Sequence, residues 1–211
     1  METISNYLFD LDGTITNPKN GILGSVRHAL RELGREIPDE KTLELFIGPP
    51  LKDSFAEYCG MDAQTADLAV LKYREFYVVN GIYDCYLYPG MEQTLSTLQK
   101  RGARLFIATS KPQPFAEMIC DHFAISRYFT KIVGSGLHGE RDTKLAVIRC
   151  VLSEFDIEPS TAVMIGDRKY DILPAAQLSM KSVAVTYGYG SRAELEAAAP
   201  TRTIDDIREL L

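Results

Sequence analysis

The sequence predicts an α/β fold with a parallel sheet and a separate all-helical segment. Over residues 85–211, short apolar runs alternate with amphipathic helical patterns, which is typical of parallel strands joined by covering helices. Residues 17–80 show helical periodicity and no convincing strand. Polar clusters follow three of the apolar runs, which favours a ligand site at the carboxyl ends of the strands. We therefore expect a core domain of residues 1–16 and 85–211, with a helical domain of residues 17–84 inserted after the first strand.

Length and composition narrow the classes of function. The 211 residues suffice for one good core and a smaller accessory unit. A net charge of −6 gives no basic field for a nucleic acid polymer, and no apolar run approaches the ~20 residues that span a bilayer. The N-terminus lacks a basic segment followed by an apolar stretch, and the four cysteines form no Cys-x-x-Cys pair. We expect a cytoplasmic protein, monomeric or homodimeric, that acts on a small molecule away from any membrane.

The first elements follow from apolar spacing. The run 7–9 is short, apolar and followed by a turn residue, which predicts the end of a buried strand. Apolar residues three and four apart then predict a helix that ends near residue 33, with Gly34 closing it. A short helix starts at Asp39 or Thr42, and Gly48-Pro49-Pro50 breaks the chain. Two more helices are expected, over 51–58 and 63–80.

The rest of the chain alternates between the two kinds of element. Gly and Pro punctuate it and Ser or Thr residues precede several of the helical patterns. The predicted strands cover 104–108, 131–133, 162–165, 182–185 and a brief segment at 202–204, and the predicted helices cover 91–100, 115–123, 143–155, 171–177 and 192–198.

The first polar cluster, Asp10-Leu11-Asp12-Gly13, is the most informative stretch. In an extended chain Asp10 and Asp12 project to the same side, where two carboxylates repel each other. A divalent cation would remove that repulsion, and ligation by oxygen suits Mg²⁺. Gly13 lets the backbone approach a ligand closely, and amides in such a turn can bind an anion. The alternative is a strand that simply ends in a polar turn.

Two further clusters follow later strands. Thr109-Ser110 offers hydroxyl and amide donors for a phosphate oxygen, although Ser and Thr are also common helix caps. Asp167 and Asp171 lie four residues apart, a spacing at which like charges repel on a helix unless a cation binds them. Stabilisation of a helix start by negative charge would also explain them. Lys144 follows a plausible cap at Thr143, where it opposes the helix dipole; it is either a surface lysine or a partner for a phosphate or a carboxylate.

The string Phe9-Asp10-Leu11-Asp12-Gly13-Thr14, followed in order by Thr109, Lys144 and Gly166-Asp167-x-x-x-Asp171, resembles the four motifs of the haloacid dehalogenase (HAD) superfamily. The resemblance covers essentially the whole chain. It implies a Rossmann-like core and a helical cap inserted between the first and second motifs.

The resemblance also implies a chemistry, since most members are Mg²⁺-dependent phosphohydrolases. Asp10 is then the nucleophile and Asp12 the general acid/base. The implied Mg²⁺ ligands are Asp10, the backbone carbonyl of Asp12, and Asp167, with Asp171 ligating through water or steadying Asp167. Thr109 and Lys144 would hold the phosphoryl oxygens, helped by amides near Gly13 and Ser110.

Within the superfamily the chain looks most like the phosphoglycolate phosphatases. The Ile47–Leu51 loop and the Tyr187–Arg192 segment are also similar to bacterial 5′-nucleotidase-like proteins. The expected partner is therefore a small phosphorylated metabolite. Lys52 is the candidate for a substrate carboxylate, and Tyr83 or Tyr86 for a nucleobase. A phosphomutase acting on a sugar phosphate and a non-catalytic HAD-fold binding module are the alternatives.

Overall fold

The computed structural model describes residues 4–137 and 140–211 of the chain. It consists of two compact units, one formed by residues 1–17 and 87–211 and the other by residues 18–86. Across the described residues, no helix is both long enough and apolar enough to cross a membrane.

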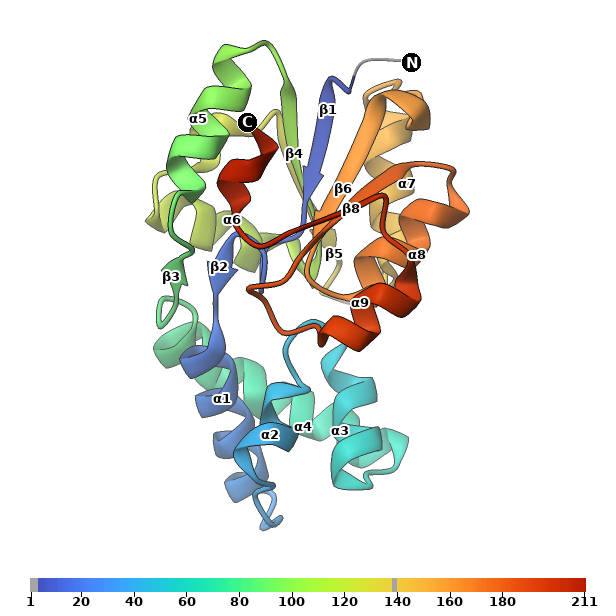
Figure 1. The fold of residues 1–211 in the computed structure, drawn as a ribbon. Helices are drawn as coiled ribbons and strands as arrows, with labels where there is room; N and C mark the ends of the chain where they lie inside the picture. Colours follow the sequence, from blue (N-terminus) through green and yellow to red (C-terminus); the bar gives the residue numbers. More distant parts are fainter. Residues whose placement is uncertain (1–3, 138–139) are drawn as a thin grey trace. The chain divides into compact units, whose positions relative to one another are not determined.

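The larger unit is built on one sheet of six parallel strands, in the order β5-β4-β1-β6-β7-β8 (Figure 1). The first strand lies in the centre, and the chain builds outward from it on one side and then on the other. The strands are β1 (Asn6–Phe9), β4 (Arg104–Pro112), β5 (Lys131–Ser135), β6 (Ala162–Gly166), β7 (Lys181–Val185) and β8 (Arg202–Ile204). The predicted α/β class with a parallel sheet is confirmed.

Alternation along the strands divides the core between the two faces of the sheet. Leu8 on β1 and Phe106 on β4 point to the face where α7 (Lys144–Glu154) and α8 (Lys169–Gln177) pack. Phe9 points to the other face, where its ring meets Phe129 edge-on. Helices α5 (Met91–Lys100) and α6 (Gln113–His122) contact β4 there. Helix α9 (Arg192–Ala198) packs on α8. Both faces are therefore covered, as a buried parallel sheet requires.

Two elements of the larger unit have other bounds than the sequence predicted, and two short strands were not predicted. Strand β4 continues beyond residue 108 to Pro112, because a shift in register after Ala108 lets Pro112 pair with Ser135 of β5. Helix α8 begins at Lys169, two residues earlier than expected. Two short strands, β2 (Thr16–Asn17) and β3 (Tyr86–Leu87), form a small separate sheet. Strands of two residues carry too little alternation to be recognised in a sequence.

The smaller unit is helical, as expected. It contains α1 (Lys19–Glu32), α2 (Glu40–Glu44), α3 (Leu51–Cys59), α4 (Ala63–Phe76) and a π-helical turn (Tyr77–Gly81). Gly34, in the left-handed region, closes α1: its N–H and that of Arg35 bond back to Arg31 and Leu30. Asp39 is the N-cap of α2, because its side chain accepts the N–H of Thr42 at 2.8 Å.

The predicted helix over 63–80 changes to π geometry in its last part. Gly21 of α1 faces Gly81 of this turn so closely that a Cβ on Gly21 would lie 2.0 Å from the Gly81 carbonyl oxygen. The two glycines allow the backbones to pack, an approach that helical spacing alone does not reveal.

Candidate active site

The candidate site lies where β1, β4 and β6 end. These three strands are neighbours in the sheet, and the chain order reverses around β1. Such a switch point leaves a crevice at the carboxyl ends of the strands. Asp10 directly follows β1, Thr109 is in the last part of β4, and Asp167 directly follows β6. The parallel sheet thus brings together three of the four predicted motifs, and α7 and α8 supply the remaining residues.

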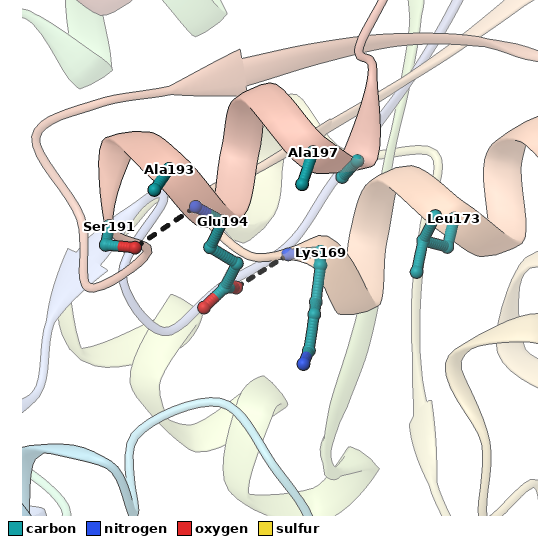
Figure 2. A pocket seen from close by; sticks show the side chains of 7 residues that line it. Lys169, Leu173, Ser191, Ala193, Glu194 and Ala197 are labelled. Atoms are coloured by element: carbon teal, nitrogen blue, oxygen red, sulfur yellow. Dashed lines mark hydrogen bonds between the residues drawn. The ribbon is translucent and has the colours of Figure 1, made fainter.

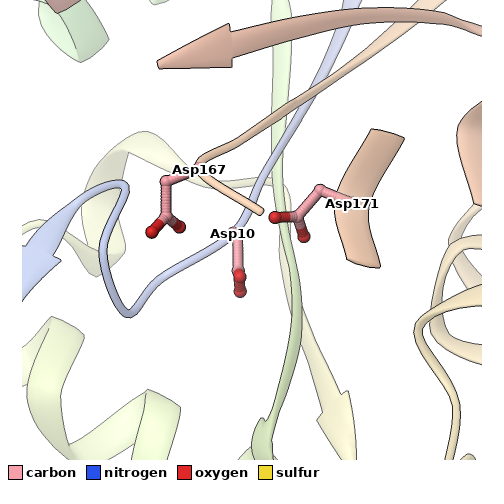
Figure 3. A group of neighbouring side chains, drawn as sticks. All are labelled: Asp10, Asp167 and Asp171. Atoms are coloured by element: carbon pink, nitrogen blue, oxygen red, sulfur yellow. The ribbon is translucent and has the colours of Figure 1, made fainter. Parts of the chain in front are cut away.

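Asp10, Asp167 and Asp171 form one buried cluster (Figure 3). Each offers a carboxylate oxygen, and these oxygens lie within 4.8 Å of one another. The residues are 5%, 1% and 0% exposed, respectively. Three carboxylates this close and this far from water repel strongly, so the cluster calls for positive charge.

Lys144 supplies one positive charge to the cluster. It is the first residue of α7, and the Thr143 hydroxyl caps the helix by accepting the N–H of Ala146. Its Nζ lies 2.8 Å from Asp10 Oδ1 and 2.8 Å from Asp171 Oδ1. The sequence left open whether Lys144 was a surface lysine; the structure places it in the cluster, only 6% exposed.

Asp167 is held from two sides. The Thr14 hydroxyl donates to its Oδ1 at 3.2 Å, and the backbone N–H of Tyr189 donates to its Oδ2 at 2.8 Å. Two glycines leave the space that this carboxylate fills. A Cβ on Gly13 would lie 2.3 Å from Asp167 Oδ2, and one on Gly188 would lie 2.3 Å from Asp167 Cβ. Gly13 also has a φ of 85°, which other residues rarely adopt.

The electrostatics of the cluster reflect a shortage of positive charge. Burial raises the pKa of Asp167 to about 8, and the charges of Asp171 and Asp10 add to the rise. Burial also raises the pKa of Asp171 to about 7, although Lys144 opposes that rise. Burial by itself would lower the pKa of Lys144, but the charges of Asp10 and Asp171 outweigh it and raise that pKa above its ordinary value.

This donor set fits a hard divalent cation. Mg²⁺ prefers carboxylate oxygens and is commonly held by one or two of them. Asp10, Asp167 and Asp171 are the residues whose side chains could hold the ion, which would offset the charge that Lys144 leaves unbalanced. An acidic triad of this kind is typical of the metal site in HAD proteins.

Asp12 lies outside this cluster. Its Oδ2 is 2.5 Å from the Lys111 ammonium, and both side chains are largely buried. Its Oδ1 is buried and has no hydrogen-bond partner within the described part of the chain. Lys111 was not predicted as a site residue, and its position directly after the Thr109-Ser110 pair is the only signal for it in the sequence. A metal ligand at Asp12 would have to be the backbone carbonyl, which stays a prediction.

The other predicted residues fall in different places. Thr109 is buried on β4, where its Oγ1 accepts the N–H of Lys111 at 3.2 Å. The Ser110 carbonyl accepts a hydrogen bond from the Ser135 hydroxyl. Lys52 lies on α3 of the helical unit with a side chain that is 49% exposed, and it pairs with Asp67 of α4 at 2.7 Å. Its predicted role in substrate binding stays a prediction.

A separate hollow of about 450 Å³ lies between α8 and α9 (Figure 2). None of the clustered carboxylates lines it. Two of its polar side chains already have partners: Glu194 accepts the N–H of Lys169 at 2.9 Å and the guanidinium of Arg168 at 2.9 Å, and Ser191 accepts the N–H of Glu194. The candidate site is therefore the buried cluster at the strand ends and not this hollow.

Comparison with known proteins indicates the same family that the sequence motifs resemble. A family model described as "Haloacid dehalogenase-like hydrolase" matches residues 7–185. A 5′-nucleotidase of Pseudomonas aeruginosa is 43% identical over 97% of this chain and 93% of its own length. The tyrosine-protein kinase PtkA of Mycobacterium tuberculosis is 34% identical over 97% of this chain and 71% of its own.

A third relative, phosphoglycolate phosphatase 1 of P. aeruginosa, is 28% identical over 97% of this chain and 77% of its own. Among solved structures, that of a predicted phosphatase from Clostridium acetobutylicum superposes with a TM-score of 0.95 at 40% identity, covering 99% of this chain and 97% of the other. By its motifs, its sheet order and these matches, the chain belongs to the haloacid dehalogenase-like hydrolase family.

Proposed function

We propose that this protein is a Mg²⁺-dependent phosphatase that hydrolyses a small phosphate monoester, a nucleoside 5′-monophosphate or phosphoglycolate, through a phosphorylated Asp10. The observation that carries the proposal is the buried cluster of Asp10, Asp167 and Asp171 with Lys144 at the switch point of the sheet. Two of the relatives bear names of such phosphatases. When bound, Mg²⁺ would neutralise negative charge and orient a phosphoryl group against a carboxylate.

The contacts of Asp10 indicate which oxygen reacts. Oδ1 accepts the N–H of Leu11 at 2.8 Å and the Lys144 ammonium at 2.8 Å. Those two donors fix the carboxylate and draw negative charge toward Oδ1. Oδ2 has neither contact, and we assign it as the nucleophile that attacks phosphorus.

Asp12 supplies the proton transfers in this proposal. As the bond from Asp10 Oδ2 to phosphorus forms, the ester bond to the leaving oxygen breaks, and that oxygen takes a proton from Asp12. The Asp12 carboxylate then accepts a proton from a water molecule, which attacks phosphorus and frees Asp10 and inorganic phosphate. Oδ1 of Asp12, which has no hydrogen-bond partner among the described residues, is the oxygen suited to both transfers, because Oδ2 is paired with Lys111.

Thr109 and Lys144 complete the phosphate site in the proposal, with donors near Gly13 and Ser110. Lys52 is proposed to bind a substrate carboxylate; alternatively, Tyr83 or Tyr86 is proposed to stack on a nucleobase. The two tyrosines are exposed by 47% and 56%, and an aromatic ring is the side chain that stacks on a nucleobase.

The decisive experiment is a phosphate-release screen with and without Mg²⁺. The panel holds nucleoside 5′-monophosphates, phosphoglycolate, sugar phosphates and pyrophosphate, run on wild type and on Asp10→Asn. Asp156→Asn is the matched control, because Asp156 is exposed in the same unit and its φ of 49° suits asparagine. Release that needs both Mg²⁺ and Asp10, and that survives the control substitution, supports the phosphatase.

Product analysis of the same reactions, with ATP and a tyrosine-containing protein added as phosphoryl donor and acceptor, and a BeF₃⁻ trapping experiment separate the alternatives. A phosphomutase would return an isomeric sugar phosphate, and a kinase-like activity would move the phosphoryl group to a protein tyrosine; neither releases stoichiometric phosphate. A binding module would do none of these and would not be trapped with BeF₃⁻ at Asp10. No release from any compound by folded, Mg²⁺-loaded protein contradicts the phosphatase proposal.

A further inference from the structure

The loop Tyr187–Gly190, between β7 and α9, contacts two parts of the site at once. The backbone N–H of Tyr189 donates to Asp167 Oδ2 at 2.8 Å, and the Tyr189 hydroxyl donates to Asn17 Oδ1 at 2.7 Å. A single residue thus connects a carboxylate of the cluster to the last residue of β2. That strand leads the chain out of the larger unit and into α1.

Tyr187 makes a second connection of the same kind. Its hydroxyl donates to the carbonyl of Thr14 at 3.0 Å, and its ring lies 4.6 Å from the ring of Tyr88. Burial raises the pKa of the Tyr187 hydroxyl, so the group stays a neutral donor at any physiological pH. Thr14 in turn donates its side-chain hydroxyl to Asp167 Oδ1. The loop therefore holds both oxygens of Asp167, one directly and one through Thr14.

Glycines bring the loop this close to Asp167. A Cβ on Gly188 would lie 2.4 Å from Asp167 Oδ2 and 2.5 Å from the carbonyl oxygen of Gly13. A Cβ on Gly190 would lie 2.0 Å from the carbonyl oxygen of Asp167. Tyrosines and glycines alternate over residues 187–190: the tyrosines make the hydrogen bonds that hold the loop, and the glycines let its backbone approach Asp167 closely.

We propose that the Tyr187–Gly190 loop is a positioning clamp, meaning that it sets the orientation of the Asp167 carboxylate for Mg²⁺. The hydrogen bond from Tyr189 to Asn17 is the contact that holds the loop in place. The inference rests on the proposed function in that it takes Asp167 as a ligand. The Tyr189 hydroxyl bond to Asn17 fixes the backbone whose N–H orients the carboxylate. Loss of that bond lets the amide and Asp167 move, so Mg²⁺ binds more weakly while the fold persists.

The test compares Mg²⁺ binding by calorimetry for Tyr189→Phe, Asn17→Ala and the double variant. One hydrogen bond carries the effect, and such bonds are worth about 2- to 10-fold in an equilibrium constant, so each single variant should bind Mg²⁺ about 2- to 10-fold more weakly. The double variant should be no weaker than the single variants, because both remove the same bond. Tyr128→Phe is the matched control: its hydroxyl donates to Glu92 at 3.1 Å on α5 and contacts no residue of the cluster.

Wild-type affinity in Tyr189→Phe overturns the clamp, as does an equal loss in Tyr128→Phe. Hydrogen exchange of residues 11–17 is the second readout, because it needs neither Mg²⁺ nor activity. If wild type binds no Mg²⁺, the proposed function fails, and exchange alone decides the clamp. Faster exchange of these residues in Tyr189→Phe then supports it, and unchanged exchange overturns it.

Discussion

Replacing Lys144 with methionine tests the electrostatic account of the site most directly. The substitution keeps the apolar stem and removes the ammonium that lies 2.8 Å from both Asp10 and Asp171. Breaking a buried ion pair by removing one partner costs about 3–5 kcal/mol, because the other charge stays buried. This loss of stability has an upper limit, because the unpaired carboxylate can take up a proton instead. Keeping a carboxyl of ordinary pKa neutral at pH 7.5 costs about 5 kcal/mol. We expect the free energy of unfolding of the metal-free protein to fall by about 3–5 kcal/mol at pH 7.5.

The same reasoning fixes the sign of the pH dependence. The folded-state pKa of Asp171 lies above its ordinary value, so the stability that this group contributes is present at low pH and is lost as pH rises toward about 7. Removing Lys144 removes the main opposition to the rise in that pKa and leaves the weaker effect of the Arg168 backbone N–H. The deficit of Lys144→Met against wild type should therefore shrink between pH 7.5 and pH 5, and saturating Mg²⁺ should reduce it at pH 7.5.

The assay is urea unfolding in EDTA, followed by circular dichroism. Lys169→Met is the matched control, because Lys169 is the first residue of α8, as Lys144 is of α7, yet its side chain is exposed. Its unfolding free energy should stay within about 0.5 kcal/mol of wild type. Equal stability of the two variants at pH 7.5, with no change on acidification, would refute the account of a charged, buried cluster.

Three further predictions concern metal, backbone and surface. Mg²⁺ binding near pH 7 should release protons, because Asp167 and Asp171 have pKa values raised to about 8 and about 7 and must ionise to bind; calorimetry in buffers of different ionisation enthalpy measures the release, and none would contradict the shifts. Gly13→Ala should abolish measurable Mg²⁺ binding and lower the free energy of unfolding in urea by about 1–3 kcal/mol, because the new Cβ would lie 2.3 Å from Asp167 Oδ2 on a residue with a φ of 85°. Mg²⁺ binding as in wild type would show that the backbone around residue 13 can shift to accept the Cβ. Lys52→Ala should change the unfolding free energy by less than about 1 kcal/mol, because the pair with Asp67 is exposed, and should raise KM with little change in kcat if Lys52 binds substrate; an unchanged KM removes that role.

The sequence predicted the fold class and the cluster because both depend on local signals that the sheet then combines. Two strands, one ending just before Asp10 and the other just before Asp167, can be recognised from their apolar runs, and parallel pairing brings their ends together. Lys144 was recognisable as a lysine in an unfavourable place at a helix start, where the dipole opposes it.

The features of the site that the sequence did not predict depend on contacts between segments that are far apart in the chain. The Lys111 contact with Asp12 arises only after β4 pairs beside β1. The bond from Tyr189 to Asp167 joins positions whose relation no local period encodes. Propensity and periodicity describe one segment at a time, so they cannot assign such partners.

The central position of β1 has a consequence for how the protein is made. Asn6–Phe9 is synthesised before the other strands of the sheet, and its two neighbours begin only at Arg104 and Ala162. During synthesis β1, with the apolar side chain of Leu8, therefore has no neighbouring strand until the helical unit has been made and β4 follows. Its other edge is paired only after β6 has been synthesised. The nascent chain should thus remain a substrate of chaperones until β6 is translated, and truncations before residue 162 should aggregate instead of forming a smaller folded protein.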